Sequence, residues 1–391
     1  MLKRIRKGIG IFLGIIILFF AVLFVAMSIF NSPTYAWRII RYGESDIKDT
    51  QIFTERPIKN GTNYSIIERD HHETPYEVEY PYKDETRKKV LDDLLQRTGT
   101  HAFLIIKDDK LIYETYLESS RKEINTSFSS AKSFNSALIG AAISDGKIGS
   151  VDDLVIKYVP EIAGRGLNAL TIRDLLMMNS GIRYLESGEL PFYYAPFADD
   201  ALTYYPSDLR KVALSVKASG AAIGKAFRYN NYHPLLEGLI IERATGMHVA
   251  EYLQEKFWKP MGAEFPASWS LDSQQSGMEK MESGLNARAI DFAKFGRLYS
   301  QRGCWNGKQI IPESWIVEST TVEPNAKWTN YKYLWWIPRS GKGRFMAVGN
   351  LGQFIYIAPD KDCMILRFGR GKPRNWQRIY PQLFAQITEL L

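Results

Sequence analysis

The chain contains few of the residues that usually hold metal ions. Its 391 residues include two cysteines and five histidines, and neither set has the spacing of a metal-binding motif. Cys304 and Cys363 could pair in an oxidising compartment, but nothing in their spacing demands a disulfide. We therefore expect no metal ion in the functional site.

Positive charge is in excess at one end of the chain only. The formal charge is +7, and six basic residues precede the first acidic residue, Glu44. The remainder is close to neutral, so no footprint for nucleic acid is present. Hydrophobic residues make up 45% of the chain and charged residues 24%, which excludes a disordered protein and allows one large domain or two lobes.

Charge and proline are both absent between Ile9 and Phe30. This run is long enough to cross a bilayer and longer than the core of an ordinary signal peptide. The basic residues before it should stay in the cytoplasm, which places Asn31 and the rest of the chain outside. Cleavage after a signal peptide is the alternative, because Ala26-Met27-Ser28 is an acceptable small-x-small site. We predict an uncleaved signal-anchor, and no lipobox cysteine is present.

The rest of the chain divides into two parts. Residues 31–85 are polar and punctuated by proline, and we expect an extracytoplasmic stalk that wraps onto the domain or spaces it from the anchor, residues 1–30. Residues 86–391 are expected to form the globular domain, and residues 151–283 within it are mostly helical in pattern.

Strand patterns occur at both ends of the globular region. The expected strands are residues 102–106, 111–117, 344–348, 353–357 and 363–368. The expected helices outside residues 151–283 include 84–98, 286–300 and 379–391. This order predicts an α/β (α+β) fold, in which an antiparallel sheet from both ends is flanked by helices and carries an inserted helical lobe. A cleft between the sheet and the lobe is the expected position of a site.

A serine nucleophile is indicated by Ser129-Ser130-Ala131-Lys132. A spacing of three residues puts both side chains on one helix face, where a lysine can help the serine hydroxyl to lose its proton. The pattern Ser-x-x-Lys occurs four times, at Ser45, Ser119, Ser129 and Ser144. Only Ser129 opens an apolar helical run. The alternative is a helix-capping serine followed by a surface lysine.

Two later motifs can complete such a site. Tyr229-Asn230-Asn231 is the only Tyr-x-Asn in the chain; Tyr229 could take the Ser129 proton, and Asn231 could donate to a substrate carbonyl. Gly349-Asn350-Leu351-Gly352-Gln353 leads into a strand, and its glycines allow close backbone approach. The N–H groups of Ser129 and Gln353 could then form an oxyanion hole. An ordinary loop tyrosine and a plain turn are the alternatives.

Taken in this chain order, the three motifs resemble the serine β-lactamase and penicillin-binding-protein superfamily. More narrowly, they are similar to its class C-like branch, which includes 6-aminohexanoate-dimer hydrolases and carboxylesterases. The likeness runs from about residue 90 to the end of the chain. It implies a β-lactamase/transpeptidase-like fold, an acyl-enzyme on Ser129, a proton relay through Lys132 and Tyr229, and no cofactor. The residues expected around the substrate or its oxyanion are Asn231, Asn350, Gly352 and Gln353.

The third motif departs from the family pattern. The family triplet usually begins with lysine or histidine and continues with a small residue, whereas Asn350 and Leu351 stand here. Because the cation normally engages a substrate carboxylate, neutral Asn350 favours a neutral amide or ester.

Together with the apolar N-terminal run, the resemblance implies a membrane-anchored serine hydrolase of a bacterial cell envelope, acting outside the cytoplasm on a small-molecule or cell-wall acyl substrate. Alternatives are a penicillin-interacting peptidase or D-alanyl esterase that acts on wall polymers, and an inactive envelope scaffold of the same fold. The sequence leaves the oligomeric state open.

Overall fold

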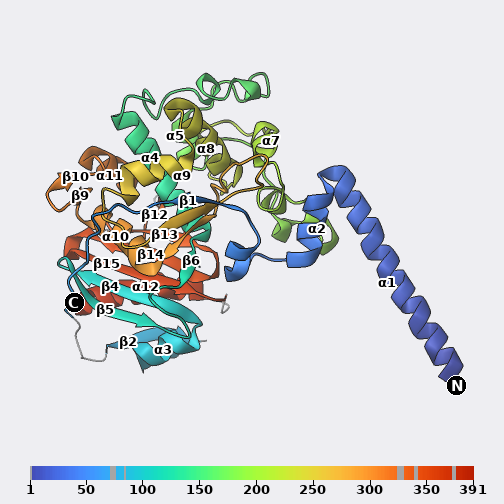
Figure 1. The fold of residues 1–391 in the computed structure, drawn as a ribbon, viewed down its shortest axis with the longest axis horizontal. Helices are drawn as coiled ribbons and strands as arrows, with labels where there is room; N and C mark the ends of the chain where they lie inside the picture. The colour runs from blue at the N-terminus through green and yellow to red at the C-terminus, as the bar shows by residue number, and fades with distance from the viewer. Residues whose placement is uncertain (1, 71–75, 83–84, 324–329, 339–341, 372–375) are drawn as a thin grey trace.

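A seven-stranded antiparallel sheet is the centre of the computed structural model, which describes residues 2–70, 76–82, 85–323, 330–338, 342–371 and 376–391. The strand order is β11-β12-β13-β14-β15-β4-β5 (Figure 1). The strands are β4 (Thr100–Lys107), β5 (Lys110–Tyr116), β11 (Tyr331–Lys332), β12 (Trp335–Trp336), β13 (Phe345–Gly349), β14 (Gln353–Ala358) and β15 (Cys363–Gly369). β15 pairs with β4, so the two ends of the domain meet within one sheet, as the sequence predicts.

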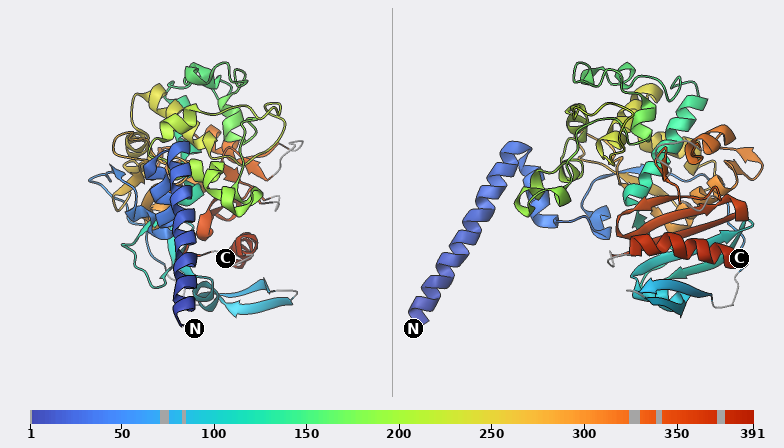
Figure 2. Two further views of the ribbon diagram at one scale, coloured as in Figure 1. Left: turned by 90° about the vertical axis from the view of Figure 1, so that its right-hand side faces the viewer. Right: turned by 180° about the vertical axis from the view of Figure 1, so that it is seen from behind.

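Both faces of this sheet are covered. Leu104 and Leu366 face the larger core with α4 (Ala131–Ser144) and α10 (Ala289–Ser300). Phe103 and Ile365 face a second core with α3 (Leu91–Arg97) and α12 (Trp376–Leu390), and Figure 2 shows α12 lying across that face. Since successive side chains point to opposite faces, β14 and β15 are buried at every residue. Both cysteines are free thiols.

The inserted lobe is mostly helical, as predicted. Its α-helices are α5 (Ile172–Leu176), α6 (Asp199–Leu202), α7 (Leu209–Leu214), α8 (Tyr232–Thr245) and α9 (Val249–Leu253). α8 stops at Gly246, whose φ of 70° is left-handed and suits glycine at a helix end. α4 packs against α8, so one helix links the sheet to the lobe.

Two expected helices begin later than predicted. The first part of the helix expected over residues 84–98 is instead β3 (Glu85–Val90), which pairs with β2 (Glu77–Tyr82); Asp84 lies outside the described residues. The apolar spacing that indicates a helix begins only at Leu91, and pairing with β2 overrides helix propensity before it. Likewise β8 (Leu285–Arg288) precedes α10.

An N-terminal arm of residues 2–58 joins a long helix to the domain. α1 (Leu2–Phe30) projects away from the lobe (Figures 1 and 2), and its residues 5–30 are long and apolar enough to cross a membrane, by length and composition. The arm continues with α2 (Pro33–Tyr42), η1 (Ile47–Gln51) and β1 (Glu55–Ile58). β1 pairs with β7 (Ala267–Ser270) of the domain, so this part of the segment expected to be a stalk lies on the domain.

Candidate active site

Ser129 lies in a tight turn at the start of α4. This turn is η2 (Phe128–Ser130), which follows β6 (Ile124–Thr126). Phe128 has a left-handed φ of 43°, an uncommon conformation for a bulky residue. Ser127 Oγ donates a hydrogen bond to the carbonyl of Ser283 at 2.5 Å, so the turn is also held by a segment that is distant in sequence. Ser129 is half-buried between two buried neighbours, so its hydroxyl is held but accessible.

Lys132 lies directly below this hydroxyl on α4. Its Nζ donates hydrogen bonds to Ser129 Oγ at 2.9 Å and to the main-chain carbonyl of Glu282 at 2.8 Å. Lys132 is 1% exposed, so the alternative of a surface lysine is wrong. A desolvated amine held against a serine hydroxyl has the geometry needed to exchange a proton with it.

Tyr229 approaches the same lysine from the lobe. Lys132 Nζ lies 5.0 Å from the centre of the Tyr229 ring. Trp336 stacks on this ring with a centroid distance of 5.9 Å, and Tyr331 meets it edge-on at 6.5 Å. These aromatic contacts fix the tyrosine beside the lysine. Tyr229, which is distant in sequence from Ser129 and Lys132, therefore lies beside them in the structure.

A cavity of about 570 Å³ opens beside Ser129. Asn231 and Asn350 from the expected set line it, together with Tyr204 and Tyr205. The Asn231 Oδ1 atom is buried and has no hydrogen-bond partner among the described residues, although buried polar atoms are normally paired. Asn231 therefore lies in the cavity wall with its amide oxygen unpaired.

The third motif forms the turn between β13 and β14. A Cβ atom at Gly349 would collide with the main-chain oxygen of Ser127, so only glycine lets the end of β13 approach the Ser129 turn this closely. Gly352 has a φ of 83°, and a Cβ there would collide with the guanidinium of Arg367. Both glycines of the motif are therefore required by close contacts.

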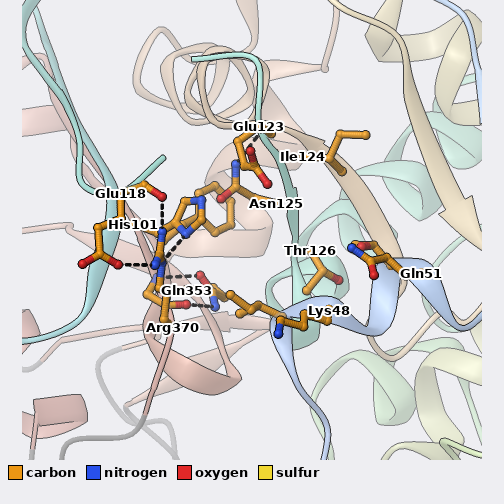
Figure 3. A pocket seen from close by; sticks show the side chains of 14 residues that line it. Lys48, Gln51, His101, Glu118, Glu123, Ile124, Asn125, Thr126, Gln353 and Arg370 are labelled. Carbon is orange, nitrogen blue, oxygen red and sulfur yellow. Dashed lines mark hydrogen bonds and ion pairs between the residues drawn. The ribbon is translucent and has the colours of Figure 1, made fainter. Parts of the chain in front are cut away.

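Asn350 and Gln353 lie at different cavities. Asn350 lines the Ser129 cavity, and its Nδ2 donates to Ser45 Oγ at 2.9 Å. Gln353 lines a second cavity of about 260 Å³, beside His101 and Arg370 (Figure 3). Its side-chain amide exchanges two hydrogen bonds of 2.9 Å with the main chain of residue 369. The turn thus presents Asn350 to the serine, while the Gln353 side chain points elsewhere.

No sequence pattern indicated the carboxylates of the Ser129 cavity. Glu44, Asp200 and Glu282 line it, and its described lining residues include no lysine or arginine. Glu282 is 2% exposed; its Oε1 accepts from Lys280 Nζ at 3.0 Å and from Ser283 Oγ at 2.9 Å, while Oε2 has no partner within the described part of the chain. The three carboxylates come from segments that are distant in sequence, so only the fold brings them together.

Two titratable side chains are buried behind the site on α8. Burial raises the pKa of Glu237 to about 8, although the Asn135 amide and the charge of Lys132 oppose the shift. Burial also lowers the pKa of His233 to about 3, and its Nε2 lies 2.5 Å from Ser180 Oγ. Both side chains are therefore mainly uncharged at neutral pH, which limits the cost of burying them.

The fold and this site define a class of protein. The Beta-lactamase family model matches residues 88–380, and the chain belongs to that family; it is a serine hydrolase of the β-lactamase type.

Particular relatives narrow the comparison. The chain is 24% identical over 330 residues to the 6-aminohexanoate-dimer hydrolase of Paenarthrobacter ureafaciens, across 78% of this chain and 82% of that protein. It is similar to the solved structure named "Putative 6-aminohexanoate-dimer hydrolase from Bacillus anthracis", with a TM-score of 0.74 and 25% identity over 88% of this chain and 92% of that one. A class C beta-lactamase shares the fold, with a TM-score of 0.55 and 16% identity over 74% and 91% of the two chains.

Proposed function

We propose that this protein is a membrane-anchored, extracytoplasmic serine hydrolase that cleaves an amide or ester through an acyl-enzyme on Ser129. The observation that carries the proposal is the 2.9 Å hydrogen bond between Lys132 Nζ and Ser129 Oγ, with the lysine buried. An inactive scaffold has no need of a buried lysine at a half-buried serine, because burying an amine is costly.

Acylation begins when Ser129 Oγ attacks the acyl carbon and loses its proton to neutral Lys132 or to Tyr229 as phenolate. The N–H of Ser129 and a second N–H from the β13–β14 turn stabilise the oxyanion. The sequence predicts Gln353 as the second donor, and Asn350 is the other candidate because it lines the cavity. Tyr229 returns the proton to the leaving amine or alcohol, and water then releases the acyl group.

The anchor sets the location of the enzyme. The apolar helix follows a basic N-terminal segment, so the positive-inside rule orients the domain outside the cytoplasm of a bacterial cell. A cleaved signal peptide is the alternative. Packing of α1 against α2 of the arm supports a retained helix, since a removed segment needs no contact with the mature protein.

The test of the proposed function is covalent labelling of the full chain in detergent with a fluorophosphonate. Label is expected on the peptide that contains Ser129, and Ser129→Ala should abolish it. Ser144→Ala is the matched control, because Ser144 belongs to another Ser-x-x-Lys sequence and lies at the far end of the same helix; it should label like the wild type. Absence of label from folded wild-type protein would favour the inactive scaffold.

The charge of the cavity supports a substrate without a carboxylate. Glu44 and Asp200 lie on its wall without a cationic residue beside them in the described lining, and like charges brought together without counter-ions repel. An ammonium-bearing ester, such as a D-alanyl ester, suits this cavity better than a penicillin does. The acidic lining thus favours the esterase alternative over the penicillin-interacting peptidase.

We expect the enzyme to hydrolyse the 4-methylumbelliferyl ester of butyrate with a kcat/KM about tenfold or more above that of the corresponding succinate monoester, because the second carboxylate meets Asp200 and Glu44. Asp200→Asn should narrow this ratio severalfold, whereas Glu313→Gln, a change at an exposed carboxylate of α11 (Glu313–Thr320), should leave it unchanged. Equal rates for the two esters in the wild type would contradict the electrostatic argument.

A further inference from the structure

One wall of the Ser129 cavity is built by segments that also hold the end of α1. Ile39 of α2 lines the cavity with Tyr204 and Tyr205, and all three belong to an apolar cluster that includes Met27 of α1. Met27 is fully buried in this cluster. The cluster therefore fixes the end of α1 relative to the cavity.

Polar contacts strengthen the same junction. Tyr35 Oη of α2 donates to the carbonyl of Pro196 at 2.5 Å, and Arg38 Nη1 donates to the carbonyl of Tyr205 at 2.9 Å. Tyr205 Oη in turn donates to the carbonyl of Gly43 at 2.8 Å. Pro196, Tyr205 and Gly43 all line the Ser129 cavity. The seating of α2 thus determines the shape of this wall.

The opposite face of α2 carries exposed apolar side chains. Trp37 and Ile40 lie one turn apart and are 57% and 40% exposed, and Arg41 beside them is exposed as well. Figure 1 shows α2 beside the outer end of α1, so these side chains lie close to the point where α1 would leave a bilayer. Tryptophan and arginine next to an apolar span are typical of residues at a membrane surface.

A second exposed aromatic group borders the cavity. The turn η6 (Phe192–Phe197) contributes Ala195 and Pro196 to the lining. Its Tyr193 and Tyr194 are about half exposed, and its Phe197 contacts Phe30 of α1 with a centroid distance of 5.1 Å. Two structural elements of the cavity wall therefore touch the end of α1 and present aromatic side chains outward.

We propose that the Ser129 cavity opens at the membrane surface and that its substrate is an amphiphile of the same bilayer, whose apolar chain stays among the lipids beside α2 while its ester or amide reaches Ser129. This inference rests on the proposed function and names the substrate class of that site. A cavity for soluble substrates needs neither a wall that is bonded to the anchor nor exposed aromatic residues at its edge. Both features suit a substrate that arrives from the membrane.

The test compares two fluorophosphonates on the full chain in nanodiscs of phosphatidylcholine and phosphatidylglycerol. One carries a hexadecyl chain and partitions into the disc, and the other carries an ethyl group and stays in solution. In both reactions Ser129 Oγ bonds to phosphorus, fluoride leaves, and the serine proton passes to Lys132 or Tyr229. Both reagents therefore form the same bond to the serine and differ in the alkyl chain, which decides whether they arrive from the disc or from solution.

The diagnostic variant is Trp37→Ser with Ile40→Ser, and Val317→Ser on α11 is the control because Val317 is 48% exposed in another part of the domain. The double variant should slow labelling by the hexadecyl reagent about fivefold or more and leave the ethyl reagent unaffected. The control should change neither rate.

If the double variant changes the labelling rates of both reagents equally, or changes neither, the inference is overturned. A second comparison supplies the hexadecyl reagent either in the enzyme's own disc or in separate vesicles, and equal labelling rates from the two sources would also overturn the inference. Failure of both reagents to label Ser129 in folded wild-type protein would instead overturn the proposed function.

Discussion

Replacement of Lys132 by methionine is expected to lower the rate of Ser129 acylation by about three orders of magnitude. Methionine fills a similar volume but removes the amine that is hydrogen-bonded to Ser129 Oγ, so the hydroxyl would have to react without this base. The fold should survive, since the variant introduces no buried charge. Stopped-flow or time-resolved labelling with a fluorophosphonate measures the rate, and circular dichroism measures the fold.

Two further variants separate the chemistry of Lys132 from its charge. Lys132→Arg keeps a cation in place, but a guanidinium does not give up its proton at any ordinary pH; it should be nearly as slow as Lys132→Met. Lys147→Met removes an exposed lysine just beyond the same helix and should react like the wild type. A fast Lys132→Arg variant would show that Lys132 acts by charge alone and that Tyr229 is the base.

The stability of the protein is expected to fall between pH 6.5 and pH 8, and Glu237→Gln should abolish this fall. The pKa of Glu237 is about 8 in the folded protein against 4.5 in the unfolded chain. Between these values the folded state holds a proton that the unfolded state releases, so the free energy of unfolding decreases as pH rises through 8. From pH 4.5 to 8 the loss is on the order of 5 kcal/mol, of which about 2 kcal/mol falls between pH 6.5 and 8.

The acid side should behave in the opposite sense. The pKa of His233 is about 3 in the folded protein against 6.5 unfolded, so its contribution to stability is lost as pH falls from 6.5 towards 3. In the wild type Glu237 offsets this loss between pH 6.5 and 4.5, whereas in Glu237→Gln the whole loss should be visible. Thermal unfolding of wild type, Glu237→Gln and the exposed control Glu251→Gln across this range gives the test. A parallel decline above pH 6.5 in Glu237→Gln and wild type would show that another group titrates there.

Local patterns indicated the sheet and the Ser129 turn well. The β4–β5 and β13–β15 strands have apolar residues on both faces, and Ser129 is the one Ser-x-x-Lys serine that precedes a continuous apolar helix. The helix expected from residue 84 was wrong in its first half, because β3 pairs with β2, the strand that immediately precedes it in the chain. The periodicity of residues 84–98 alone does not reveal a pairing with the residues before them.

Most of the residues that form the walls of the Ser129 cavity could not be predicted from the sequence. Ser45 contacts Asn350 across 305 residues, and the main-chain carbonyl of Glu282 accepts a hydrogen bond from Lys132 across 150 residues. Trp336 stacks on Tyr229 in the structure, but the sequence alone could not distinguish this role from ordinary packing in the core. Residues that act through tertiary neighbours leave no local pattern for a single sequence to reveal.

Proteolytic cleavage of the N-terminal arm would change the Ser129 cavity, because the arm is hydrogen-bonded to the cavity wall. A protease that cuts an ordinary stalk releases an intact enzyme into the surroundings. Here a cut between α2 and η1 would detach the segment that supplies Ile39 and Gly43 to the cavity, and Tyr205 Oη would lose its acceptor. In the proposed membrane-anchored enzyme, release at this point would therefore alter the Ser129 cavity, so that the cut which frees the domain would also lower its activity.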